Sequence, residues 1–177
     1  MNRIAFLAIA LLLVMARPGY AFPQAREPRG FAELRSLVGE WQGTNEKGEA
    51  VDATFKLVAG NSALLEVDTF ADESTNVIVY YMDTSRVALT LFSKANNQPR
   101  MSADPAVGDA RKLDFSFVGA TNLHSNQIGH MHHLLLHFED NDHFSAVWTW
   151  RHYDQEQNET YRFTRKHTDS PRVSTSH

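Results

Sequence analysis

Between Gly39 and Arg165 the chain alternates apolar and polar residues with a period of two, interrupted by turn-forming residues about every eight to twelve positions. Successive side chains of a strand point to opposite faces, so this alternation is typical of an antiparallel barrel or sandwich. Tight turns at residues 83–85 and 140–142 favour an up-and-down order, and closing the sheet removes its two exposed edges. We predict an all-β fold, an antiparallel up-and-down barrel of about nine to ten strands.

The expected strands follow a short N-terminal helix. Phe31, Leu34 and Leu37/Val38 repeat at helical spacing, which predicts one or two amphipathic turns ending at Gly39. The first strand is expected from Gly39, and the others at residues 50–57, 63–70, 76–82, 87–94, 99–102, 112–118, 130–139, 144–153 and 160–165.

The first residues resemble a secretory signal peptide. Arg3 precedes an uncharged run over residues 4–15, which is shorter than the ~20 apolar residues that a membrane span needs. Gly19-Tyr20-Ala21 then places small residues where a signal peptidase inspects them, so cleavage is expected before Phe22, with Ala16 as a competing site. An uncleaved membrane anchor is the alternative. We predict a signal peptide at 1–21, a barrel domain at 22–166 and a disordered tail at 167–177.

The charge and the cysteine content of the chain limit which functions and which compartment are expected. Removal of residues 1–21 changes the formal net charge from −4 to −6, and no basic patch remains to bind nucleic acid. The chain has no cysteine, which fits an exported bacterial protein of the periplasm better than a cross-linked extracellular one. After signal cleavage we expect no stable membrane anchor. A small-molecule ligand is the expected partner.

Gly129-His130-Met131-His132-His133 opens an apolar run that ends at Phe138. Alternation places His130 and His132 on the same face as Leu134, Leu136 and Phe138, which is expected to be the interior. A turn at residues 140–142 pairs Phe138 with Phe144. Counting back predicts His132 opposite Trp150 and His130 opposite His152.

Two interpretations of these histidines remain open. His130, His132 and His152 could converge on a divalent transition metal, with an open coordination position, or on haem. The favoured alternative is that they are ordinary polar residues at the barrel rim, because no carboxylate is evidently placed to orient the rings. His124, His133, His137 and His143 are expected outside the barrel or in loops.

Arg100 and Asn122 are further candidates for ligand binding, together with Trp148 and Trp150. A guanidinium at a barrel mouth can hold a ligand carboxylate in a bidentate pair, although Arg100 could also be an exposed loop residue. Asn122 could donate to the same ligand or simply close a turn. The carboxylates Glu66, Asp68 and Asp114 alternate with apolar residues and are expected on the outer face.

Gly39-x-Trp41 after a short helix resembles the lipocalin and calycin barrels, in which a tryptophan plugs the closed end. Residues 97–101 (NQPRM), 117–122 (FVGATN) and 129–132 (GHMH) resemble an uncharacterised family of bacterial secreted lipocalin-like domains. This resemblance covers roughly residues 31–165 and implies a small barrel with no assigned activity. Leu91-Phe92-Ser93 departs from the His-Tyr-Cys of that family, so no thiol chemistry is expected.

These observations predict an exported lipocalin-like protein that binds a small apolar or amphipathic ligand inside its barrel. A metal- or haem-binding barrel, with or without catalytic activity, is the alternative. Non-enzymatic binding is favoured because the chain contains no Gly-x-Ser-x-Gly elbow, no thiol and no recognisable acid pair.

Overall fold

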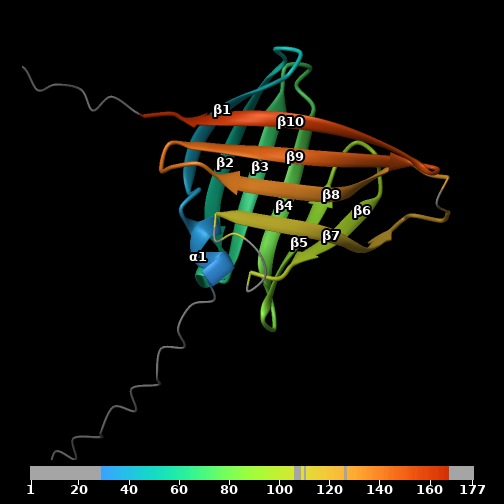
Figure 1. Cartoon of the computed structure of the whole chain (residues 1–177), viewed down its shortest axis with the longest axis horizontal. Coiled ribbons are helices and arrows are strands. Elements are labelled where there is room, and N and C mark those ends of the chain that lie inside the picture. The colour runs from blue at the N-terminus through green and yellow to red at the C-terminus, as the bar shows by residue number, and fades with distance from the viewer. Residues whose placement is uncertain (1–28, 106–108, 110, 126, 168–177) are drawn as a thin grey trace, which may run out of the picture.

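A computed structural model describes residues 29–105, 109, 111–125 and 127–167 (Figure 1). In these residues one α-helix, α1 (Arg29–Arg35), precedes ten strands that form a closed antiparallel barrel. The strands are β1 (Gly39–Asn45), β2 (Ala50–Val58), β3 (Ala63–Phe70), β4 (Thr75–Asp83), β5 (Arg86–Phe92), β6 (Gln98–Ala103), β7 (Lys112–Thr121), β8 (His130–Phe138), β9 (His143–His152) and β10 (Gln155–Arg165), with a short 3₁₀ turn, η1 (Ala59–Asn61), between β2 and β3.

Each strand pairs with its neighbours in the chain, and β1 closes the barrel by pairing with β10. The predicted fold class and strand order are therefore confirmed. The predicted signal peptide and residues 168–177 of the predicted tail lie outside the described residues. Within the described residues no helix has the length and apolar character needed to cross a membrane.

Several element boundaries differ from the expected ones, among them those of the helix and of β10. The helix begins at Arg29 and ends at Arg35, since Leu37 and Val38 donate to carbonyls three residues back and tighten the last turn before β1. Strand β10 begins at Gln155 rather than at residue 160. Its first four residues are exposed and polar, so they show no alternation, yet they pair with β9 residue by residue.

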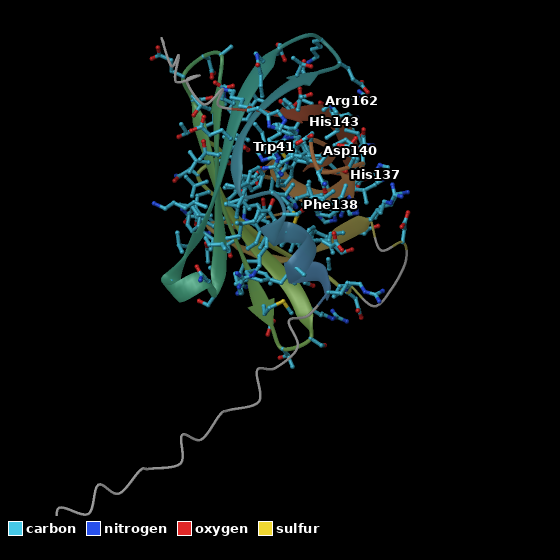
Figure 2. The ribbon with its side chains drawn as sticks, turned by 90° about the vertical axis from the view of Figure 1, so that its left-hand side faces the viewer. Trp41, His137, Phe138, Asp140, His143 and Arg162 are labelled. Atoms are coloured by element: carbon cyan, nitrogen blue, oxygen red, sulfur yellow. The ribbon has the colours of Figure 1, made fainter. Side chains whose placement is uncertain are left out.

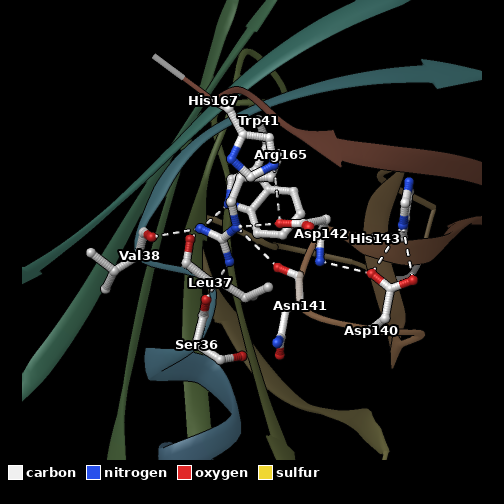
Figure 3. Close-up of polar contacts among 10 residues, drawn as sticks. All are labelled: Ser36, Leu37, Val38, Trp41, Asp140, Asn141, Asp142, His143, Arg165 and His167. Atoms are coloured by element: carbon white, nitrogen blue, oxygen red, sulfur yellow. Dashed lines mark hydrogen bonds and ion pairs between the residues drawn. The ribbon is translucent and has the colours of Figure 1, made fainter. Parts of the chain in front are cut away.

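One end of the barrel is closed by Trp41 and Arg165 (Figure 3). The Trp41 indole is buried, and its Nε1 donates to the Leu37 carbonyl at 2.7 Å. The guanidinium of Arg165 lies 4.1 Å from the centre of the indole. Arg165 also donates to the carbonyls of Ser36, Val38 and Asn141, at 2.6, 2.9 and 3.0 Å. One side chain therefore joins the helix end, β1 and the β8–β9 turn.

Aromatic side chains fill the barrel behind this closure. Phe144 packs its ring edge to face with Trp41 at 4.8 Å between ring centres, and it stacks on Phe163 at 4.5 Å. Figure 2 shows Trp41 between the walls of the barrel and His143 toward its outside. The half of the barrel next to α1 is thus a packed core, and a ligand has to enter from the other end.

Candidate functional site

A cavity of about 540 Å³ occupies the barrel at the end opposite α1. Its mouth is formed by the turns that follow β1, β3 and β5, including Glu49, Asp72 and Lys94. These turns lie together because successive strands run antiparallel. The β2–β3 turn lies at the opposite end of the barrel, where Arg35 of α1 donates to the Asn61 carbonyl. A smaller hollow of about 340 Å³ shares Met131, Trp148, Trp150 and Glu159 with this cavity.

Aromatic rings form one wall of the cavity. Trp148 and Trp150 reach it from β9, Tyr161 from β10 and Phe70 from the end of β3. The two tryptophans predicted near a ligand pocket therefore line one, and their part in binding remains a prediction. Gly129 leaves room for Trp150, because a β-carbon added at Gly129 would lie 2.2 Å from the indole.

Strand β3, which carries Phe70, also brings two carboxyl groups to the cavity, Glu66 and Asp68, which were predicted to lie on the outer face. That prediction is wrong: each is only 5% exposed, and both line the cavity from β3. The register with β2 explains the difference, since Glu66 pairs with Phe55 and Asp68 with Ala53 on the buried face of β2. Asp114, by contrast, is exposed as predicted and accepts a hydrogen bond from His133 Nε2 at 2.5 Å.

The pKa of both buried carboxyl groups is raised. Burial, followed by the charge of Asp68, raises the pKa of Glu66 well above its ordinary value. Burial also raises the pKa of Asp68 to about 7, although its hydrogen bond with Glu66 lowers it. Tyr80 donates to Glu66 Oε2 at 2.6 Å, and burial keeps the pKa of this phenol well above 10. Asp68 therefore titrates near neutral pH.

Polar contacts hold the mouth of the cavity in place. The buried Asn45 donates through Nδ2 to Glu49 Oε2 at 2.6 Å and to Glu159 Oε1 at 2.8 Å, which links the β1–β2 turn to β10. Lys94 and Asp72 form an exposed ion pair at 3.3 Å. An exposed pair of this kind contributes little stability, so this side of the mouth can rearrange at low cost.

The histidines do not line the cavity, because β8 contains a bulge. Phe138 lies opposite Phe144 and Leu134 opposite Trp148, in the predicted register. The register then shifts between Met131 and His133, so Met131 lies opposite Trp150 and His130 opposite Arg151. The predicted pairing of His132 with Trp150 and of His130 with His152 is therefore wrong. A bulge adds one residue to one strand and changes which side chains face inward.

His130 and His132 instead pack around Phe117. Their ring centres lie 4.9 Å from that ring, and a 3.1 Å hydrogen bond joins His130 Nε2 to His132 Nδ1. The second ring nitrogen of His130 lies 3.1 Å from the Ile128 carbonyl. His152 is exposed and packs against Tyr153. Across the described part of the chain, no three His, Cys, Asp or Glu side chains are grouped to hold a metal ion.

Burial and Arg151 lower the pKa of His132, in that order, and the neighbouring His130 adds to the effect. This shift favours the neutral imidazole of His132 beside the aromatic ring. The remaining histidines match their prediction: His124 and His143 are exposed, and His133 and His137 alternate with the buried residues of β8.

Arg100 and Asn122 also lie away from the lining of the cavity. Arg100 is exposed on β6 between the buried Pro99 and Met101, over Gly119 of β7. Asn122, at a φ of 58°, donates to the Asn96 carbonyl at 3.0 Å and so joins two loops. Of the two roles considered for Asn122, the geometry favours closing a turn. The ligand-binding role of both residues remains a prediction.

Comparisons with known proteins assign no role to the residues of the cavity. No family model matches the chain, and no curated protein matches it. One solved structure to which the fold is similar is titled "Structure of EF1p2_mFAP2b bound to DFHBI". The match is 12% identical in sequence, covers 77% of this chain and 98% of that one, and has a TM-score of 0.34. The chemistry of the cavity therefore rests on its own residues.

Proposed function

We propose that this protein is an exported binding protein that holds a small amphipathic molecule in its barrel. The observation that carries the proposal is the cavity of about 540 Å³, which is lined by aromatic rings and by two buried carboxyl groups. Pockets of ~300–1,000 Å³ with apolar walls and a few convergent polar groups are typical of small-molecule sites. A barrel whose only task was stability would fill this volume with side chains, as the half near Trp41 does.

The wall chemistry favours an amphipathic ligand over a purely apolar one. Glu66 and Asp68 each lose hydration on burial, which costs free energy unless a partner replaces the water. A ligand with a polar end can supply that partner, while its apolar part packs against Trp148 and Trp150.

Binding is tested with Nile red, a neutral dye whose fluorescence rises in apolar surroundings. We expect saturable binding by the protein purified from cells that express the full-length chain. Ala71→Trp places an indole at the exposed edge of the cavity and should weaken binding about tenfold or more by occupying its mouth. Val118→Trp is the matched control, because Val118 is 64% exposed and does not line the cavity. Equal affinity of the two variants would contradict binding in the barrel.

Export is the second part of the proposal, and it is supported by the uncharged run over residues 4–15 and by Gly19-Tyr20-Ala21. In a bacterial host we expect the protein in the periplasmic fraction, with an intact mass that lacks residues 1–21. An uncleaved chain in the membrane fraction would instead support the anchor interpretation.

A further inference from the structure

The carboxyl pair of β3 faces the cavity without a cation beside it. Glu66 and Asp68 are two residues apart on one strand, so their side chains share the inner face. Glu66 has Tyr80 as a donor at 2.6 Å. Lys94 lines the cavity at its mouth, but it is exposed and lies 3.3 Å from Asp72. The inner wall therefore has acidic groups and no basic side chain of its own among the described residues.

Asp68 has an unfilled position for a hydrogen-bond donor. Its side chain is 95% buried, and its Oδ1 has no hydrogen-bond partner among the described residues. Buried polar atoms are nearly always paired, because an unpaired one loses the hydration that it had in the unfolded chain. Since Asp68 lines the cavity, a molecule inside the barrel lies next to the side chain that carries this oxygen.

The aromatic part of the cavity lining suits a positive charge as well as an apolar body. Trp148, Trp150 and Tyr161 line the same cavity. The face of an aromatic ring carries negative potential, which attracts ammonium groups, and tryptophan does so most strongly. Acidic oxygens and aromatic rings around one cavity are two features by which proteins recognise organic cations.

We propose that the ligand is an organic amine whose ammonium group donates a hydrogen bond to Asp68 while its apolar body packs against Trp148 and Trp150. This inference rests on the proposed function and adds the chemical class of the ligand. A metal ion fits less well, because the cavity is far larger than an ion and no three ligating groups converge in it. An anionic ligand would meet Glu49, Asp68, Asp72 and Glu159 against the single cation Lys94.

The pH dependence of binding follows from the groups that face Asp68. Besides Asp68 itself, these are Glu66 on β3, Tyr80 on β4, Glu159 and Tyr161 on β10, and Glu49, Asp72 and Lys94 at the mouth. The cavity lining of the described chain includes no histidine. The pKa of both tyrosines is raised and that of Asp72 is lowered, so none of these three titrates near neutrality. Asp68, with a pKa of about 7, gains its charge there, and amine binding should strengthen as the pH rises from 6 to 8.

The test compares three probes with the same naphthyl body: naphthylethylamine, naphthylethanol and naphthylacetate. An alkylammonium group has a pKa near that of lysine, about 10.4, and stays charged over this pH range. By isothermal titration at pH 8 we expect the amine to bind about tenfold more tightly than the alcohol, and the carboxylate to bind least well. The ratio of amine to alcohol affinity should fall between pH 8 and pH 6.

Asp68→Asn should reduce the ratio of amine to alcohol affinity to about one, and Glu66→Gln should reduce the preference in part. Asp114→Asn removes an exposed carboxylate of the outer face and is the matched control, with the preference retained. If the alcohol binds as tightly as the amine, or if the carboxylate binds best, the inference is overturned and the proposed function stands. If no probe and no Nile red binds, both are overturned. If the variants fail to fold, a pH-independent amine preference in the original protein overturns the inference.

Discussion

Gly129 sets the position of Trp150 by lacking a side chain. Gly129 directly precedes the histidine segment, and the Trp150 indole packs against it. A β-carbon added at Gly129 would come within 2.2 Å of the ring. Contacts this short cannot be relieved by small shifts, so any larger residue has to displace the indole from the cavity wall.

Gly129→Ala should therefore destabilise the protein by about 1–3 kcal/mol and alter the near-ultraviolet circular dichroism of the tryptophans. Gly119→Ala is the control, because the nearest atom to its added β-carbon is the flexible end of Arg100 at 3.4 Å. We expect the free energy of unfolding of the control to stay within about 0.5 kcal/mol of that of the original protein. Equal unfolding midpoints for the two variants in urea would show that the indole is free to move.

Asp68 makes the stability of the protein depend on pH. Above pH ~4 the unfolded chain has lost the proton of this carboxyl group, whereas the folded chain keeps it until about pH 7. The folded state then binds more protons, so the free energy of unfolding falls as the pH rises through this window. A rise in pKa from 3.8 to about 7 corresponds to a loss of about 4 kcal/mol at ~1.4 kcal/mol for each pH unit.

Asp68→Asn should abolish that loss. We expect the variant to be more stable than the original protein by a few kcal/mol at pH 8 and similar to it at pH 4, because asparagine keeps an acceptor for Glu66 and never gains a charge. Urea unfolding at the two pH values measures the difference, and Asp114→Asn is the exposed control. A variant that is less stable at pH 8 would contradict the pKa that we assign to Asp68.

At the scale of elements, the side chain of Arg165 connects three segments of the chain. Its three bonds to backbone carbonyls need the planar fork of a guanidinium, which lysine lacks. Arg165→Lys should lower the free energy of unfolding by about 2–4 kcal/mol, since bonds to a charged group are among the stronger ones.

Chemical unfolding at neutral pH measures the loss, with Arg162→Lys as the control. Arg162 lies on the same strand and is exposed, and its replacement should change stability by less than about 0.5 kcal/mol. A loss of similar size in both variants would mean that the carbonyl contacts contribute nothing specific.

The alternation of apolar and polar residues predicted the strands well, but it identified only some of the residues that line the cavity. Phe138 and Phe144 pair as expected, because a short turn fixes the register next to it. The extra residue of the β8 bulge leaves no mark in the alternation, so Met131 takes the inward place expected of His132.

The acidic pair was missed for a different reason. Strand β3 has apolar residues on both faces, and carboxylates usually lie outside, so Glu66 and Asp68 were assigned to solvent. Val51, Ala53 and Phe55 of β2 form its buried face. Counting across the turn at residues 59–62 from Leu57 to its partner Leu64 would have placed Glu66 beside Phe55, inside the barrel.

At the scale of the whole molecule, the barrel has two unlike halves. The half near α1 is packed with rings around Trp41, and the other contains the cavity and two buried carboxyl groups. Local stability follows packing and the satisfaction of polar groups, so the two halves should open with different free energies.

Native-state hydrogen exchange at pH 8 should resolve this difference along single strands. In β9 we expect the amide of Phe144 to exchange about tenfold or more slowly than that of Trp150, and saturating naphthylethylamine to narrow the gap. Uniform protection along β9 would mean that the cavity does not weaken its half of the barrel.

The closure at Arg165 also bears on how the protein is made. Arg165 and Val38 are 127 positions apart in the chain, and the first strand finds its second neighbour only in β10. A ribosome delivers the chain from its N-terminus, so β1 keeps one edge unpaired until nearly everything else has been synthesised. A chain that is cut short within β10 would consequently form an open sheet with two unpaired edges, which is prone to aggregate and has no closed barrel around the cavity.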